Sequence, residues 1–340
     1  MLSITLDIER MNQTQAAVGT IEYEGLSQEI RDYWRQLPNK GFFFTLLAVW
    51  LALFQFLGSS TFGYVDTASL FTWMYKAYTG NLVVSDDSHG TLIPFVVLGL
   101  MWWKRKELLS QPLHNWWPAL FIVAFGLVMH MAGYVIQQPR LSIIGLFAGI
   151  YGLTGLAWGP GWLKRSFFPF FLFGFCIPLG SLTEPVTFPL RLLVSKLVAF
   201  IGQNILAIDV EAIGTRLIKM PWQYEYEVAA ACSGIRSLVA IVAIAIVYAF
   251  MVFNKNWQRL LLIGSAVPLA VIGNTVRMLL IVIAAEIGGQ EAGVAVHDDT
   301  FWSMVPYVPA IIGLMLIGRW LEGPRPRSHA ASAEAGGQSL

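Results

Sequence analysis

The chain has 340 residues, of which 56% are hydrophobic and only 13% are charged. Soluble domains carry about 25% charged residues, so this composition excludes an ordinary soluble protein and predicts a membrane protein. The formal net charge of +1 gives no reason to expect a nucleic-acid partner. Two cysteines without a paired-cysteine motif argue against a disulfide framework, a structural zinc site and an iron–sulfur cluster, and we expect no metal or cofactor.

Residues 1–40 form a polar leader, with a short amphipathic helix expected over Leu26 to Trp34. Apolar runs then recur at about the 20-residue length that crosses a bilayer. They predict an all-α polytopic membrane protein, with a transmembrane domain over 41–322 and a disordered tail over 323–340. About eight transmembrane helices are expected, near 42–58, 91–103, 116–136, 141–159, 167–181, 233–253, 259–285 and 302–320.

Lysine and arginine residues follow the predicted second, fourth and eighth spans and lie between the sixth and seventh. If all eight segments cross, these residues share one side of the membrane, which the positive-inside rule identifies as cytoplasmic. They are Lys104, Arg105, Lys106, Lys164, Arg165, Lys255, Arg259, Arg319, Arg325 and Arg327. We therefore expect both termini in the cytoplasm and the segments 59–90, 182–232 and 286–301 on the outer side.

The outer segment 182–232 is expected to be a small insertion of one helix and a β-hairpin before the sixth span. Residues 185–206 have helical periodicity with few charges, which predicts a helix lying along or dipping into the interface. Residues 210–218 and 222–228 are predicted to be two short strands, the second with alternating tyrosines and glutamates. This hairpin would lead the chain directly to Cys232.

Cys232 stands at the predicted start of the sixth span, followed by the small residues Ser233 and Gly234. The positive end of a helix dipole and its unpaired N–H groups favour the thiolate, which is the nucleophilic form of cysteine. Arg236, one turn later, either lowers the thiol pKa or binds phospholipid headgroups. The other cysteine, Cys176, is expected to be an inert buried thiol.

The predicted seventh span contains Asn274 and Arg277, three residues apart and hence on one helical face. A charged side chain inside a span is costly, by about 2.5–3.5 kcal/mol on insertion scales, and is a functional candidate by default. Arg277 either snorkels to the interface and pairs within the bundle, or presents a fixed cation to a developing oxyanion.

Two histidines are expected on the outer side with Cys232. His297, in the predicted loop before the last span, is either a solvated side chain or the base that takes the thiol proton. His89, before the second span, belongs either to a helix-entry turn or to a substrate-positioning site.

Three motifs in this order resemble the exosortase/archaeosortase family. They are Ala231-Cys232-Ser233-Gly234-Ile235-Arg236, Asn274-Thr275-Val276-Arg277 and His297, with Ser88-His89-Gly90 upstream. The resemblance covers most of residues 42–320. It is specific because all three motifs occur in order and are predicted to lie on the same side of the membrane. The resemblance implies that Cys232 is the nucleophile, Arg277 the transition-state stabiliser and His297 the proton shuttle. The expected supporting or substrate-binding residues are Ser233, Gly234, Arg236, Asn274 and His89.

By this resemblance the protein is expected to be a cysteine peptidase or transpeptidase of the bacterial inner membrane. Its expected partners are membrane lipid and exported proteins with a C-terminal sorting signal, composed of a short motif such as Pro-Glu-Pro, an apolar helix and a basic cluster. The enzyme would cut near the motif through an acyl-thioester and transfer the new carboxyl end to an acceptor such as a polysaccharide or a lipid.

Three other functions remain open from the residues alone. An anion transporter would use Asn274 and Arg277 but not Cys232. A membrane acyltransferase would share the thioester and take its acyl group from a lipid. A non-catalytic assembly subunit would depend on none of the three candidate catalytic residues.

Overall fold

The computed structural model describes residues 25, 27–58, 67–79, 88–179, 184–219, 224–227, 235–299, 302, 304 and 307–322. The chain divides into two compact units, which are described separately. Unit 1 comprises residues 1–82 and 90–178, and unit 2 comprises residues 83–89 and 179–340.

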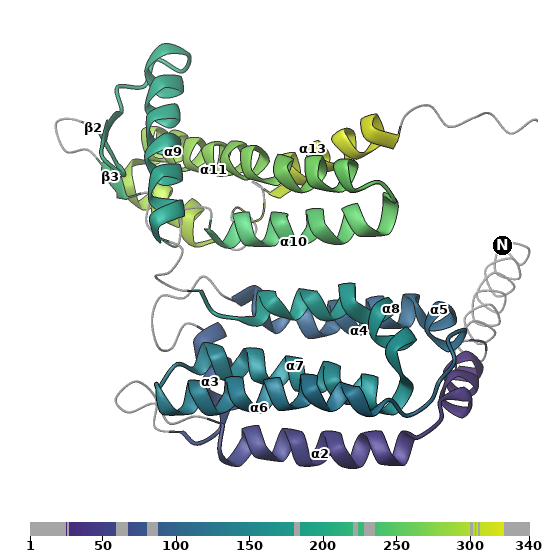
Figure 1. The fold of residues 1–340 in the computed structure, drawn as a ribbon. Helices are drawn as coiled ribbons and strands as arrows, with labels where there is room; N and C mark the ends of the chain where they lie inside the picture. Colours follow the sequence, from purple (N-terminus) through teal and green to yellow (C-terminus); the bar gives the residue numbers. More distant parts are fainter. Residues whose placement is uncertain are drawn as a thin grey trace, which may run out of the picture. The chain divides into compact units, whose positions relative to one another are not determined.

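The regular secondary structure of unit 1 is helical wherever the structure describes it (Figure 1). A helix over Ser27–Gln36 lies where the sequence predicts a short helix, and it is bent by 93° from the helix that follows. The α-helices after it are α2 (Lys40–Phe56), α3 (Leu70–Tyr78), α4 (Ile93–Trp103), α5 (Arg105–Leu109), α6 (Leu120–Val135), α7 (Pro139–Trp158) and α8 (Pro160–Phe171). Three short 3-10 helices also occur. They are η2 (Trp117–Ala119), η3 (Leu172–Cys176) and η1 (Ser88–Thr91), whose first two residues belong to unit 2.

Helix α7 is the centre of unit 1 and packs against α6 and α2. Its glycines let neighbouring backbones approach closely, as is common between membrane helices. A Cβ on Gly145 would lie 2.5 Å from the carbonyl oxygen of Gly126 in α6. On the α2 side, the Trp50 ring packs over Gly149 and its Nε1 donates a hydrogen bond of 3.0 Å to the carbonyl of Leu146.

One end of unit 1 gathers the basic residues that follow the predicted second and fourth spans. Lys104 donates a hydrogen bond of 3.2 Å to the carbonyl of Arg165, and Arg165 pairs with Glu107. Arg105 forms an ion pair of 2.6 Å with Glu29 in the N-terminal helix. Residues that are far apart in sequence therefore meet at one end, as the positive-inside reading requires.

Unit 2 contains helices and a small sheet. Its described elements are α9 (Glu184–Asn204), β1 (Glu211–Ile213), β2 (Arg216–Lys219), β3 (Tyr224–Glu227), α10 (Ile235–Val252), α11 (Asn256–Asp298) and α13 (Tyr307–Glu322). Helices α10, α11 and α13 share one apolar core, which includes Ile241, Ala266 and Leu314. A second core joins α9, the sheet and α11 through residues such as Val198 and Met278.

The sheet corrects the predicted hairpin. Residues 210–218 form two strands, β1 and β2, instead of one, because the chain turns at Gly214, whose φ of 64° favours glycine. Strand β3 then pairs antiparallel with β2, so the order is β1-β2-β3.

A second correction concerns 286–301, which the sequence predicts to be an outer loop. The chain is helical there through Asp298, and helix α11 is interrupted only at Gly289, with φ 74° and ψ −174°. Glycine adopts this backbone conformation without the steric penalty that a Cβ brings. His297 therefore lies on a helix instead of a loop.

Described helical residues overlap each of the eight predicted spans, although in the fifth the α-helix ends at Phe171 and a 3-10 helix follows to Cys176. The count of eight crossings is not confirmed. Among the described residues, four helices are long and apolar enough to cross a membrane, or five if the bent pair over 27–56 counts as one span. The four are Trp117–Val135, Pro139–Trp158, Pro185–Asn204 and Asn256–His297. The third contains most of α9. This helix is predicted from the sequence to lie at the membrane interface, but it is also long enough to cross the membrane.

Candidate active site

Two of the predicted catalytic residues meet in unit 2. The Arg277 guanidinium donates a hydrogen bond from Nη2 to the carbonyl oxygen of His297, at 3.4 Å. In an unbroken helix, residues 20 positions apart would lie about 30 Å from each other. The contact therefore requires the chain to reverse between them, and the only non-helical backbone inside α11 is at Gly289.

Strand β3 holds the part of α11 that follows Gly289. The Tyr226 hydroxyl donates a hydrogen bond of 2.8 Å to the carbonyl of Gln290. One turn on, Gly293 leaves room for the tyrosine ring, since a Cβ there would lie 2.1 Å from the Tyr226 hydroxyl. Tyr226 of the sheet is thus in direct contact with the part of α11 that carries His297.

A second tie joins the sheet to α11 before the break. Lys219 at the end of β2 pairs with both carboxylate oxygens of Glu286, at 2.5 and 2.6 Å. The Tyr224 hydroxyl approaches the same carboxylate at 3.5 Å. Burial, reinforced by the negative charge of Glu286, raises the pKa of Tyr224 to about 12. Glu286 is a structural ion-pair partner in this arrangement.

Asn274 lies three residues before Arg277 on α11 and is 3% exposed. Among the residues that the structure describes, its amide nitrogen Nδ2 is buried without a hydrogen-bond partner, and so is the Nε of Arg277. Buried donors in proteins are nearly always paired, and those that are not need an explanation. One face of α11 in unit 2 therefore carries the Asn274 amide and the Arg277 guanidinium, and both have donors available for a further hydrogen bond.

Arg277 lies close to the end of unit 2 that carries the sheet. The opposite end is marked by Arg259, whose Nε donates to the carbonyl of Phe253 at 2.8 Å, and by Gln258, which donates to the carbonyl of Leu321. Arg277 is about 27 Å farther along α11 than Arg259, a distance close to the thickness of the hydrocarbon layer.

The remaining predicted site residues are not brought together by described contacts. Cys232, Ser233 and Gly234 lie outside the described residues. Arg236 is the second residue of α10, as the predicted helix start requires. His89 lies in η1, where it groups with unit 2 while Gly90 groups with unit 1.

Cys176 is buried, as the sequence led us to expect. It lies at the end of η3, and its Sγ donates to the carbonyl of Gly90 at 3.6 Å. Within the described part of the chain, no group of three or more His, Cys, Asp and Glu side chains is placed to hold a metal ion.

Sequence reasoning missed the residues that position His297. Gly289, Gly293 and Tyr226 set the reversal of α11 and its contact with the sheet, and only the paired glycines at 288 and 289 hint at it in the sequence. The alternation that predicts β3 places Tyr224 and Tyr226 on one face, but it does not say which helix that face meets.

Comparison with known proteins gives one match. A family model described as "Transmembrane exosortase (Exosortase_EpsH)" matches residues 82–316, which include all the candidate site residues. Neither the search of curated proteins nor the search of solved structures returned a match.

Proposed function

Because this chain belongs to the transmembrane exosortase family, we propose that it is a membrane-embedded cysteine transpeptidase for sorting signals of exported proteins. In this proposal Cys232 is the nucleophile, Arg277 stabilises the oxyanion and His297 transfers the proton. The family implies substrates with a sorting signal, and we take the signal to be C-terminal, with a Pro-Glu-Pro-like motif before a membrane helix.

The contact between Arg277 and His297 carries the proposal. Twenty residues separate Arg277 from His297 in sequence, and the folded chain brings the Arg277 guanidinium to the backbone carbonyl of His297. A transpeptidase requires a cation for the oxyanion and a base for the thiol in the same pocket. The unpartnered amide of Asn274 on the same face supplies a further donor for substrate.

Chain connectivity supports placing Cys232 near these residues. Cys232 follows Glu227, the last residue of β3, by five positions and precedes Ile235, the first residue of α10, by three. An extended chain covers at most about 3.5 Å per residue, so the Cα of Cys232 lies within roughly 18 Å of the Cα of Glu227 and 11 Å of the Cα of Ile235. Strand β3 is itself bound to α11 through Tyr226.

The proposed reaction begins when the His297 imidazole takes the proton from the Cys232 thiol. The sulfur then attacks the carbonyl carbon of the scissile peptide bond, and the carbonyl oxygen becomes an oxyanion beside Arg277. Collapse breaks the C–N bond, His297 returns the proton to the leaving amine, and the apolar helix of the signal departs. An amine, a hydroxyl or water then attacks the acyl-thioester and restores the thiol.

We place this pocket on the extracytoplasmic side of the bacterial inner membrane, with both termini in the cytoplasm. The basic ends of unit 1 and unit 2 support this orientation by the positive-inside rule. Arg277 lies toward the other end of its unit, beside the sheet. A substrate with its own membrane helix would then reach the thiol from within the bilayer.

Co-expression of the full chain with an exported protein that carries a C-terminal sorting signal tests the proposal. We expect the wild type to shorten the substrate, and Cys232→Ser or Cys232→Ala to leave it at full length. Cys176→Ser is the matched control, because the serine hydroxyl can keep the hydrogen bond to Gly90 and the buried thiol has no role in the reaction.

Normal processing by Cys232→Ser would contradict the proposal. Mass spectrometry of any trapped adduct on Cys232 identifies its acyl group. A peptide supports transpeptidation, whereas a fatty acyl group would assign the chain to acyl transfer instead.

A further inference from the structure

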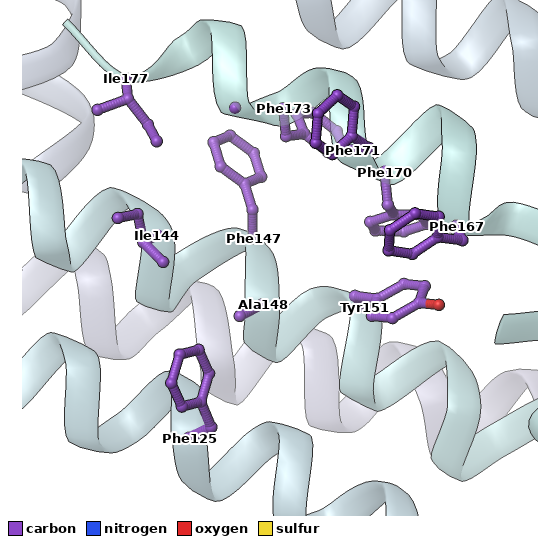
Figure 2. A pocket seen from close by; sticks show the side chains of 11 residues that line it. Phe125, Ile144, Phe147, Ala148, Tyr151, Phe167, Phe170, Phe171, Phe173 and Ile177 are labelled. Carbon is purple, nitrogen blue, oxygen red and sulfur yellow. The ribbon is translucent and has the colours of Figure 1, made fainter. Parts of the chain in front are cut away.

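Unit 1 contains an apolar groove with a volume of about 480 Å³, within the usual range of small-molecule pockets. Figure 2 shows α7 side chains on one wall, the aromatic side chains of α8 and η3 on another, and Phe125 of α6 below. The lining residues are Phe125, Ile144, Phe147, Ala148, Tyr151, Phe167, Phe170, Phe171, Phe173, Gly174 and Ile177.

The walls of the groove are fixed by ring contacts and one hydrogen bond. Phe147 of α7 stacks on Phe173 of η3, with centroids 4.1 Å apart and planes inclined by 11°. The ring centroids of Tyr151 and Phe170 are 5.1 Å apart, and the Tyr151 hydroxyl donates a hydrogen bond of 2.8 Å to the carbonyl of Leu163. The one hydroxyl in the lining is therefore already used, and the groove offers apolar surface.

The groove opens along the side of the helices. Phe125, Phe167 and Phe171 at its edge are each more than half exposed. The helices that supply its walls include two that are long and apolar enough to cross a membrane, α6 and α7. An occupant therefore enters from the hydrocarbon layer and presents apolar surface to the groove.

An exposed lysine precedes the groove residues of α8. Lys164 is exposed and sits three and seven residues before Phe167 and Phe171, so it shares their side of α8. Side chains on a helix tilt toward its N-terminus, which directs Lys164 toward the basic end of unit 1. Arg165, its neighbour, is turned to Glu107 instead.

We propose that this groove binds one acyl chain of an anionic glycerophospholipid, with the phosphate held by Lys164. Apolar walls and an adjacent cation complement the two parts of such a lipid. The transmembrane helix of a protein substrate does not fit, because three turns of a helix about 10 Å across occupy roughly 1,200 Å³. The site lies in unit 1 and is independent of the proposed peptide chemistry.

Native mass spectrometry of the full chain, titrated with phosphatidylglycerol and with phosphatidylcholine of the same acyl chains, tests the site. Lys164→Gln should weaken phosphatidylglycerol binding by roughly fivefold, the effect of one basic residue near anionic lipid, and leave phosphatidylcholine binding unchanged. Ala148→Trp fills the groove and should weaken both lipids by about tenfold, since roughly two methylenes lose their contacts.

Matched controls separate the groove from general lipid contact. Lys106→Gln removes another exposed cation at the same end, and Val49→Trp enlarges an exposed apolar residue of α2 outside the groove. Both should bind lipid like the wild type. Ile144→Phe is a smaller filling change that gives the answer if Ala148→Trp does not fold.

Three results would overturn the proposal. If both lipids bind equally and no variant changes their binding, the bound lipid is ordinary lipid of the surrounding bilayer and the groove is not a specific site. An equal loss in Lys106→Gln and Lys164→Gln would mean diffuse charge attraction without a headgroup site. Unchanged binding by Ile144→Phe and Ala148→Trp would mean that no chain enters the groove.

Discussion

At the scale of single residues, α11 combines a partly buried cation with a buried amide. Arg277 uses one of its five donors on the carbonyl of His297, at the long distance of 3.4 Å, while its Nε has no partner in the described part of the chain. Asn274 has an unpaired Nδ2 at 3% exposure. Donors left unpaired in this way cost folding free energy. This cost is explained if a substrate carbonyl or an oxyanion accepts from them.

The first prediction concerns the charge and shape of residue 277. Arg277→Gln should lower the rate of substrate cleavage by about 10²–10³-fold, the range found when one oxyanion donor is removed. Arg277→Lys keeps the charge but loses the planar fork of donors, so an intermediate rate is expected. Rates of signal cleavage in proteoliposomes measure this, and an unchanged rate in Arg277→Gln would remove the residue from the chemistry.

The second prediction separates stability from activity at residue 274. Asn274→Leu replaces a buried amide with an apolar group of similar size, so the unfolding temperature should stay the same or rise. Cleavage should nevertheless slow, because the donor offered to substrate is gone. Thermal unfolding and cleavage measured on the same preparation test both parts. A parallel fall of both would indicate that Asn274 is needed only for folding.

At the scale of elements, the reversal of α11 at Gly289 is what brings His297 to Arg277. The returning part is held against β3, where Tyr226 donates to Gln290 and packs over Gly293. The part before the break is held by the ion pair between Lys219 and Glu286. One small sheet therefore fixes both sides of the reversal.

The third prediction tests that packing through two glycines of the same helix. Gly293→Ala would place a Cβ 2.1 Å from the Tyr226 hydroxyl, so the ring or the returning helix must move and cleavage should fall. Gly264→Ala is the control, because nothing lies within 4 Å of its Cβ, and better helix propensity should stabilise it by up to about 1 kcal/mol. Equal activity of both variants would show that the Tyr226 contact does not position His297.

At the scale of the whole molecule, the chain is a multi-pass membrane protein of two units. Lys104 and Arg105 lie at one end of unit 1, and Arg259 lies at the end of unit 2 that is opposite the sheet. This arrangement favours the predicted orientation, but α9 is also long enough to cross. A crossing by α9 would reverse the side on which α10 begins. The side on which Cys232 lies therefore depends on α9.

The fourth prediction decides the side of the membrane. In a Cys176→Ser background, Cys232 is the only thiol, and a membrane-impermeant maleimide should label it in intact spheroplasts. Lys164→Cys, placed in a chain without either native cysteine, should be labelled only after permeabilisation. Labelling of Cys232 only after permeabilisation would place the thiol with Lys164 on the cytoplasmic side.

The sequence was sufficient to locate the long apolar helices, because runs such as 141–159 leave few alternatives to a buried helix. It also predicts that Arg277 and His297 share one site, and in the structure the Arg277 guanidinium donates to the backbone carbonyl of His297. It did not locate the turn at Gly214 or the break at Gly289, because residues on both sides continue a strand or helix pattern. These interruptions depend on contacts between distant segments, such as Tyr226 with Gly293, which no local pattern records.

The sheet's two attachments to α11 also bear on how the protein tolerates membranes of different thickness. Helices adjust to hydrophobic mismatch by tilting, which displaces their ends relative to one another. Here β2 and β3 are fastened to both limbs of the reversed helix, by Lys219 on one limb and by Tyr226 on the other. When α11 tilts, the two strands therefore move together with both parts of the helix. We expect the distance between Arg277 and His297 to stay the same in bilayers of different lipid composition.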